Sequence, residues 1–217
     1  MTLIDLSHTI GDGTVTYPGL PAPSISDYLS RDASKERYAP GTTFHIARID
    51  MVANTGTYLD SPSHRWEDGA DVAALLLESI ADVDGIVVTA TDGRAIDAAK
   101  FADVDVNGRA VLVHTGWSRH FATPAYATGH PFLTRDAAEA LVERGAKLVG
   151  IDSLNIDDTA DLSRPAHTLL LRAGIPIVEH LTALDRLPRD GFRFFAVPPK
   201  FRGVGTFPVR AFALVGC

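Results

Sequence analysis

Residues 54–64 read NTGTYLDSPSH and form the most informative stretch of the chain. Its candidate functional side chains all stand at even-numbered positions, which are Asn54, Tyr58, Asp60 and His64. Alternate residues of an extended chain point to the same side, so we expect Asn54, Tyr58 and Asp60 to line one face of a strand. His64 is expected just beyond that strand, because a proline between it and Asp60 interrupts a regular hydrogen-bond ladder. The alternative is an edge strand that leads into a polar turn, since Asp-Ser-Pro-Ser suits a turn.

The sequence around this stretch alternates between apolar runs and helical patterns. Residues 134–144 form the clearest predicted helix, with Thr134 as its N-cap and Gly145 as its C-cap. Two shorter helices are expected at 72–80 and 165–173. Strands are expected at 2–9, 43–52, 85–90, 110–114, 147–151, 175–178, 193–198 and 208–215. This order predicts a mixed α/β fold with several strands and only a few helices.

Length and composition favour one soluble globular domain over residues 1–217. The chain is 46% hydrophobic and 22% charged, and its formal net charge of −7 disfavours nucleic-acid binding. No apolar stretch approaches the roughly 20 residues of a membrane span, so no membrane association is expected. The first ten residues lack the pattern of a signal peptide, and the single cysteine, Cys217, excludes an internal disulfide. A cytoplasmic location is therefore expected.

A second candidate cluster lies in the last third of the chain. His167 stands near the start of a predicted helix, and Glu179 ends the apolar run 175–178. A carboxylate at the end of a buried strand is costly unless it is paired or binds a metal. The alternatives are a histidine on the helix surface and a glutamate that faces water or caps the next helix.

Together these motifs resemble the cyclase family, which includes bacterial kynurenine formamidases and isatin hydrolases. The family signature is His-x-Gly-Thr-His-x-Asp-x-Pro-x-His, and residues 54–64 match it except at its first two histidines. Further segments resemble the family in order and spacing at 5–8, 17–19, 148–152, 167–179, 198–203 and 208–211. The resemblance implies a swivelling β/β/α domain, in which a small mixed sheet or barrel packs with a few helices.

The resemblance also implies an activity and a cofactor. The expected reaction is hydrolysis of the C–N bond of a formamide, lactam or similar amide of a small, ring-containing substrate, or the reverse ring closure. The expected cofactor is a divalent metal, usually zinc or manganese, and no nucleotide cofactor is expected. The implied metal ligands in this sequence are Asp60, His64, His167 and Glu179. His64 is also the implied acid/base residue, a role that suits an imidazole.

Asn54 and Tyr58 stand where the family has two ligand histidines. An amide is a poor ligand for these metals, and a tyrosine binds them only as a phenolate. Three alternatives follow. A metal is held by the four remaining ligands; or the enzyme is metal-free, with His64 as the base and Asn54 and Tyr58 as donors to an oxyanion; or the protein is an inactive homologue that binds a small molecule.

The substrate and the partners are less well marked in the sequence. Tyr17, Phe44 and Trp66 are candidates for contact with a planar ring, although ordinary packing is the alternative for each. Trp117 is a further aromatic candidate, and His130 is an additional candidate site residue. The resemblance implies a homodimer or homotetramer in which neighbouring chains complete the pocket.

Overall fold

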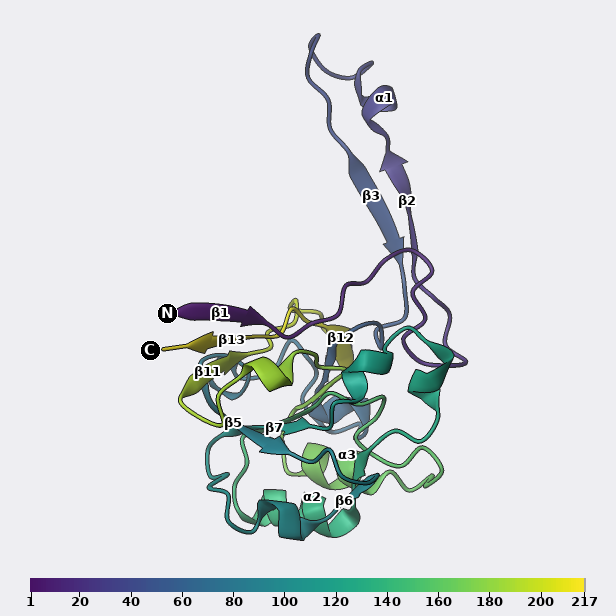
Figure 1. Cartoon of the computed structure of the whole chain (residues 1–217). Coiled ribbons are helices and arrows are strands. Elements are labelled where there is room, and N and C mark those ends of the chain that lie inside the picture. Colours follow the sequence, from purple (N-terminus) through teal and green to yellow (C-terminus); the bar gives the residue numbers. More distant parts are fainter. Residues whose placement is uncertain (217) are drawn as a thin grey trace.

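In the computed structural model, which describes residues 1–216, nine strands form one curled mixed sheet (Figure 1). In spatial order they are β1 (Thr2–Asp5), β13 (Phe212–Val215), β11 (Phe192–Phe195), β5 (Val83–Thr89), β7 (Ala110–His114), β9 (Leu148–Ile151), β10 (Ile177–Glu179), β4 (Tyr58–Asp60) and β12 (Thr206–Pro208). Strands β5, β7, β9 and β10 run parallel to one another, and the other neighbouring pairs are antiparallel. The predicted mixed α/β fold is confirmed.

Two helices cover one side of this sheet (Figure 1). They are α2 (Arg135–Glu143) and α3 (Pro165–Arg172), close to the predicted 134–144 and 165–173. Gly145 follows α2 with φ +76°, a conformation that a glycine adopts easily and that ends the helix. Thr134 stands at the N-cap, but its hydroxyl shares its proton between the Asp136 carboxylate and the carbonyl of Ile96, and it accepts no backbone N–H of the helix.

The helix predicted at 72–80 is wrong. Only Leu77–Ser79 form a short 3-10 turn there. Leu76 and Leu77 are each 64% exposed, so the segment has no continuous apolar face for a helix to bury. Among the described residues, none of the helices has both the length and the apolar character needed to cross a bilayer. The remaining short elements are β6 (Ala95–Ile96), β8 (Phe132–Leu133), and 3-10 turns at Pro62–His64, Ala98–Phe101, Trp117–His120, Pro124–Ala127 and Leu184–Arg186.

Side chains alternate between two apolar layers along the strands. Val88 of β5 belongs to the layer under α2 and α3, whereas Val87 belongs to the layer inside the curl of the sheet. Strand β4 obeys the same alternation, and Leu59 belongs to the layer inside the curl. Its neighbours Tyr58 and Asp60 therefore both point to the helix side, as the shared parity predicted.

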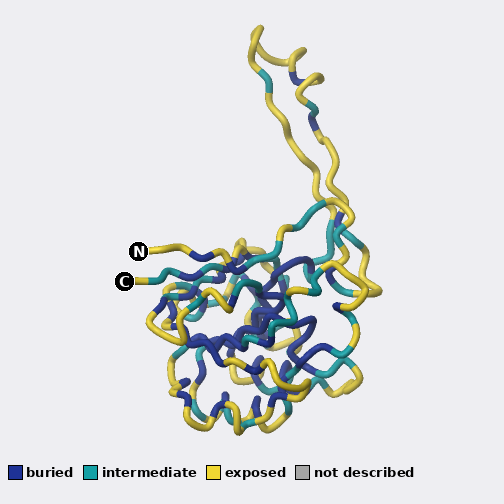
Figure 2. The backbone as a smooth tube through the Cα atoms, in the orientation of Figure 1, coloured by how far each residue is buried: buried dark blue, intermediate teal, exposed yellow. Residues whose placement is uncertain are grey.

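A two-stranded arm projects from the body of the molecule (Figure 1). It consists of β2 (Ser24–Leu29) and β3 (Ile46–Asp50), which pair antiparallel, and the short helix α1 (Arg31–Ser34) near its tip. The strand predicted at 43–52 exists, but it belongs to this arm and not to the main sheet. Figure 2 shows that most of the arm is exposed, including every residue of β3. Ile25, Tyr28, Ile46 and Ile49 therefore face solvent in the single chain, whereas Leu29 is buried.

Candidate active site

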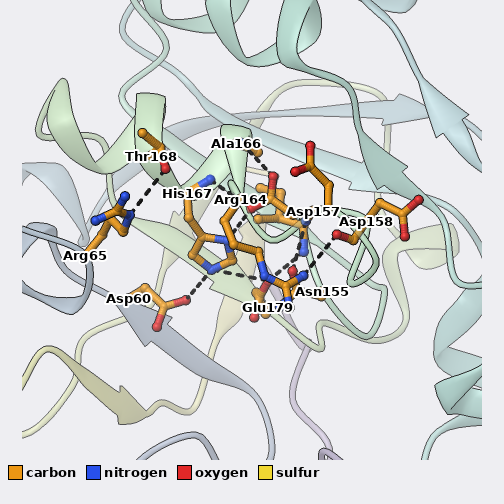
Figure 3. A network of polar contacts seen from close by, with 12 residues as sticks. Asp60, Arg65, Asn155, Asp157, Asp158, Arg164, Ala166, His167, Thr168 and Glu179 are labelled. Carbon is orange, nitrogen blue, oxygen red and sulfur yellow. Dashed lines mark hydrogen bonds and ion pairs between the residues drawn. The ribbon is translucent and has the colours of Figure 1, made fainter.

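Three neighbouring strands bring distant parts of the sequence together. Strand β4 lies between β10 and β12, and its register sets Asp60 opposite Thr206. The 3-10 turn after β4 carries His64 back beside Asp60. His167 reaches the same place from the first turn of α3, and Glu179 is the last residue of β10 (Figure 3). The two candidate clusters of the sequence therefore form one site.

Asp60, His64 and His167 form a group of candidate metal donors, with one ligand atom from each within 4.8 Å of the others. His64 Nε2 lies 3.7 Å from Asp60 Oδ1, and His167 Nε2 lies 3.7 Å from Asp60 Oδ2. Asp60 is fully buried, and among the described residues its Oδ2 has no hydrogen-bond partner. A buried carboxylate oxygen without a partner is costly. Two imidazoles and this oxygen therefore fit a divalent metal such as zinc or manganese.

Thr206 determines which nitrogen of His64 carries the proton. The Thr206 hydroxyl donates to Asp60 Oδ1 and lies 2.8 Å from His64 Nδ1. A hydroxyl has a single proton, so its oxygen accepts a hydrogen bond from Nδ1–H of His64. Nε2 of the neutral ring then keeps its lone pair. His64 lines a cavity and 35% of its side chain is exposed, so this lone pair is accessible.

Asp157 orients His167. Its Oδ2 lies 2.6 Å from His167 Nδ1, which leaves Nε2 to face Asp60 and Glu179 (Figure 3). The same carboxylate accepts the backbone N–H groups of Ala166 and His167 and so holds the N-terminus of α3. Burial opposes a charge on the ring, but the surrounding carboxylates outweigh it and raise the pKa of His167 to about 10. A metal that binds here must displace that proton.

Glu179 lies beside the donor group, with a hydrogen bond to each oxygen. The Tyr58 hydroxyl donates to Oε2 and the backbone N–H of Ile156 donates to Oε1, each at 2.6 Å. Burial, together with the charge of Asp60, raises the pKa of Glu179 to about 7. Burial and the neighbouring Glu179 also raise the pKa of Tyr58 well above its usual value, so the phenol stays protonated. Tyr58 therefore holds Glu179 as a neutral phenol.

A second buried histidine stands behind Tyr58. His180 Nε2 lies 3.3 Å from the Tyr58 hydroxyl, and His180 Nδ1 lies 2.8 Å from the hydroxyl of Tyr126. Because Tyr58 donates its proton to Glu179, it accepts from Nε2–H, and Nδ1 accepts from Tyr126. Burial disfavours the imidazolium and lowers the pKa of His180 to about 3. This neutral ring fixes the direction of the hydrogen bonds that reach Glu179.

Replacing His180 by Asn is expected to flatten the acid dependence of stability. The ring has a pKa of about 3 in the folded protein and of about 6.5 when unfolded, so the unfolded state binds more protons between these values. Stability therefore falls as the pH falls, and His180 alone accounts for about 2 kcal/mol between pH 6.5 and 5. Asn tolerates the φ of +56° at this position. Urea unfolding of the metal-free proteins at both pH values measures the difference; an equal pH dependence in the variant would contradict it.

A cavity of about 430 Å³ opens onto these residues. It brings together most of the side chains that the sequence singled out. Those lining it are Tyr17, Asn54, Tyr58, His64, His167 and Glu179. Arg65, Asn155 and Arg164 also line it, and none of them was expected from the sequence.

The aromatic candidates are divided by the structure. Tyr17 lines the cavity. Trp66 instead packs against the layer under the helices and donates its indole N–H to the carbonyl of Thr168. Phe44 lies on the arm and is 51% exposed, because the segment expected as a core strand leaves the body of the molecule. Trp117 donates its indole N–H to the carbonyl of Tyr126. Of the four aromatic candidates, only Tyr17 lines this cavity within residues 1–216.

Two important residues escaped the sequence analysis, Asp157 and Thr206. Asp157 follows the buried parallel strand β9, and polar residues beyond the carboxyl end of such strands are typical of α/β sites, so this signal was available. Thr206 gave no signal, because its role arises only from the pairing of β12 with β4. His130, the additional candidate, is buried with Nε2 3.1 Å from the carbonyl of Asp157 and supports the loop behind His167.

Two imidazoles and a carboxylate beside a cavity are a donor set of catalytic metal sites, so the fold and the site define an α/β enzyme with a candidate metal centre. A family model described as "Putative cyclase" matches residues 4–158. The chain belongs to this cyclase family, and the resemblance seen in the sequence is confirmed.

Curated relatives and solved structures agree with this assignment. Kynurenine formamidase from Maricaulis maris (strain MCS10) is 25% identical over 208 residues, which cover 95% of each chain. A solved structure described as a potential metal-dependent hydrolase with cyclase activity is 26% identical, with a TM-score of 0.81 over 98% of this chain and 96% of that chain. Isatin hydrolase A from Ralstonia solanacearum has the same fold, at 24% identity and a TM-score of 0.84 over 99% and 92% of the two chains. The protein is an arylformamidase-like amidohydrolase.

Proposed function

We propose that the protein hydrolyses the C–N bond of a formamide or related amide on a small aromatic substrate, with the help of a divalent metal. The observation that carries this proposal is the buried Oδ2 of Asp60, which accepts no hydrogen bond in the described part of the chain and has only the His167 ring, with Nε2 at 3.7 Å, beside it. Similarity to kynurenine formamidases supports a formamide as the bond that is cleaved. A cavity of about 430 Å³ suits a substrate with one ring.

The chain supplies donors and a proton acceptor. Asp60, His64 and His167 would hold the metal, which when bound supplies positive charge that acidifies water and polarises an amide carbonyl. Glu179 lines the cavity and lies 3.8 Å from His167 Nε2, so it is placed to take the proton of an attacking water and return it to the leaving nitrogen. From the sequence, His64 was expected both as a ligand and as the acid/base residue, and Glu179 as a fourth ligand. We propose instead that His64 serves as a ligand and Glu179 as the acid/base residue, because the donor group consists of Asp60, His64 and His167.

The metal-free alternative has less support. It needs the Tyr58 hydroxyl as a donor to a developing oxyanion, whereas that hydroxyl already donates to Glu179. Asn54 lines the cavity, and its side chain also forms a hydrogen bond with Tyr58, so at most one of its amide N–H groups is left for the substrate. The metal-free alternative requires two donors to the oxyanion, and a single amide stabilises an oxyanion less than two donors do.

Metal content and chelation test the proposal. The tag-free protein is analysed by plasma mass spectrometry beside His64→Ala, and hydrolysis of formanilide is assayed before and after treatment with a chelator. We expect one zinc or manganese ion per chain, lost in the variant, and hydrolysis that stops on chelation and returns with added metal. Full hydrolysis without metal would refute the metal-dependent mechanism. Failure of the metal-loaded protein to cleave any aryl formamide would refute the proposed function.

We also propose that the chain forms a homodimer or homotetramer through its arm. Ile25 and Ile49 are paired across β2 and β3, so they share one face, and they are 39% and 58% exposed. Exposed apolar residues gathered on one projecting element are typical of a protein interface, and a second copy of the chain is the proposed partner. An Ile25→Ser, Ile49→Ser double variant is expected to sediment as a smaller species than the parent. Arg48→Ser, on the opposite face of β3, is the matched control and is expected to leave the assembly intact. Unchanged sedimentation of the double variant would exclude this interface.

A further inference from the structure

A second cavity, of about 530 Å³, lies apart from the candidate active site. Thr89 and His114, the last residues of the neighbouring parallel strands β5 and β7, both line it. Ligands of α/β proteins commonly bind beyond the carboxyl ends of such strands. The candidate active site lies instead at the ends of β9 and β10, and among the described residues the two cavities share no lining side chain. A ligand in the second cavity therefore does not occupy the place of the substrate.

Aliphatic side chains form one part of the wall of this second cavity. Val87 and Leu184 belong to the apolar layer inside the curl of the sheet, and Leu187 packs against that layer. Val88 and Val104, from the layer under the helices, also line the cavity. The cavity therefore reaches both apolar layers beside the end of β5, and a wall of this kind favours burial of the apolar part of a ligand.

Positive charge dominates the rest of the wall. Lys100 lies in the 3-10 turn before β7, and Arg189 lies in the loop before β11. Within residues 1–216 neither of these side chains forms an ion pair with a carboxylate. Asp185 also lines the cavity, so two cations face one anion and the net charge of the wall is positive. The N–H groups of Lys100 and Arg189 therefore remain available to an anion from solution.

His114 lies between the cavity and a buried carboxylate. Its side chain is 18% exposed, and its Nε2 lies 4.0 Å from Oδ2 of the buried Asp152. That carboxylate already accepts the backbone N–H groups of Thr115 and Gly116 and the hydroxyl of Thr115. In the described part of the chain, neither ring nitrogen of His114 has a hydrogen-bond partner. The ring therefore keeps an N–H donor for a ligand, and the chemistry at the donor group does not use it.

We propose that this cavity is a second ligand site, which binds a small organic anion with one negative charge and an aliphatic body. Lys100 and Arg189 attract the charged group, and His114 donates a hydrogen bond to it. The aliphatic wall takes the apolar body of the ligand. Asp185 repels a second negative charge, so a monoanion fits this wall better than a dianion does. The site does not depend on the reaction at the donor group.

Calorimetric titration with hexanoate, hexanamide and acetate tests this site. Hexanamide has nearly the shape of hexanoate without its charge, and it is expected to bind at least about tenfold more weakly, as the loss of a charged hydrogen bond implies. Acetate has the charge without the aliphatic body, and it is also expected to bind at least about tenfold more weakly, because it lacks four methylene groups. Hexanoate that binds no more tightly than hexanamide or acetate overturns the inference.

Variants locate the binding. The Lys100→Gln, Arg189→Gln double variant is expected to bind hexanoate at least about tenfold more weakly than the parent. His114→Phe, which keeps a planar ring without a donor, is expected to weaken the binding as well. Arg186→Gln is the matched control, because Arg186 is an exposed neighbour that does not line the cavity, and it is expected to keep the parent affinity. The unfolding temperature establishes that each variant is folded.

His64→Ala separates this site from the donor group. It removes a candidate metal ligand and leaves the second cavity intact, so hexanoate is expected to bind it as tightly as the parent. Binding that is lost in His64→Ala, as contact with a metal ion would give, overturns the inference. Binding that the double variant leaves unchanged also overturns it. Both outcomes leave the proposed hydrolysis untouched, because that proposal is tested by metal content and formanilide cleavage.

Discussion

The Asp60→Asn variant is expected to lose the bound metal, and its kcat/KM is expected to fall by at least about 10³-fold. The side chain is fully buried, and its Oδ2 has no other partner among the described residues, so this oxygen is the natural anionic ligand of the site. An amide of the same shape removes the negative charge and is a poor ligand for zinc or manganese. Changing an outer partner of a ligand alone costs roughly 10–100-fold, so the loss of a ligand should exceed that.

Thr206→Val is the matched control for this experiment. It removes the hydroxyl that bridges Asp60 and His64 but leaves all three donors in place. We expect it to keep its metal with weakened affinity, by roughly 10–100-fold. Metal titration followed by mass spectrometry compares the three proteins. A full metal complement in Asp60→Asn would place the metal elsewhere and refute the assigned donor group.

Asp157→Asn is expected to weaken metal binding by roughly 10–100-fold and to lower turnover with it. The carboxylate lies 2.6 Å from His167 Nδ1 and can only accept, so Nδ1 keeps its proton and Nε2 is the nitrogen that binds a metal once the metal has displaced the second proton. The Asn amide can present its NH₂ group to Nδ1 instead. That arrangement favours the tautomer with the proton on Nε2, which cannot bind a metal.

The same variant separates orientation from stability. Asp157 also accepts the backbone N–H groups at the start of α3, that of Ala166 at Oδ1 and that of His167 at Oδ2, so an Asn whose NH₂ group faces Nδ1 keeps only the bond from Ala166. Asp157→Ala removes both roles and is expected to lose about 1 kcal/mol of stability in addition. Thermal unfolding and metal titration of both variants report the two effects. Wild-type metal affinity in Asp157→Asn would show that Asp157 does not set the tautomer of His167.

The strands of the sheet interior were the most predictable part of the fold. The runs at 85–90, 110–114 and 147–151 are continuously apolar, and the structure buries them on both faces as β5, β7 and β9. The arm was not predictable in this way. The strand at 43–52 has the composition of a core strand, and nothing local distinguishes a strand that packs in a sheet from one that leaves the body of the molecule.

The candidate site was predictable where its residues belong to motifs with a fixed spacing in the sequence. Asp60, His64 and His167 were identified from motifs, and they converge in the structure. The role of Tyr58 was not: its hydroxyl holds Glu179, a contact set by the antiparallel register of β4 against β10. Contacts that depend on tertiary pairing leave no mark in the local sequence.

The position of β4 between β10 and β12 also decides when the site can form during synthesis. Strands β5, β7 and β9 follow one another in the sequence and can pair as soon as the chain reaches Ile151. Strand β4 is made earlier but has no partner until β10 and β12 emerge, and Asp60 meets Thr206 across 146 residues of chain. Contacts of such long sequence separation carry a large loop-closure cost and slow the folding rate. We therefore expect the nascent chain to build its scaffold first, whereas the donor group can assemble only after β10 has been made.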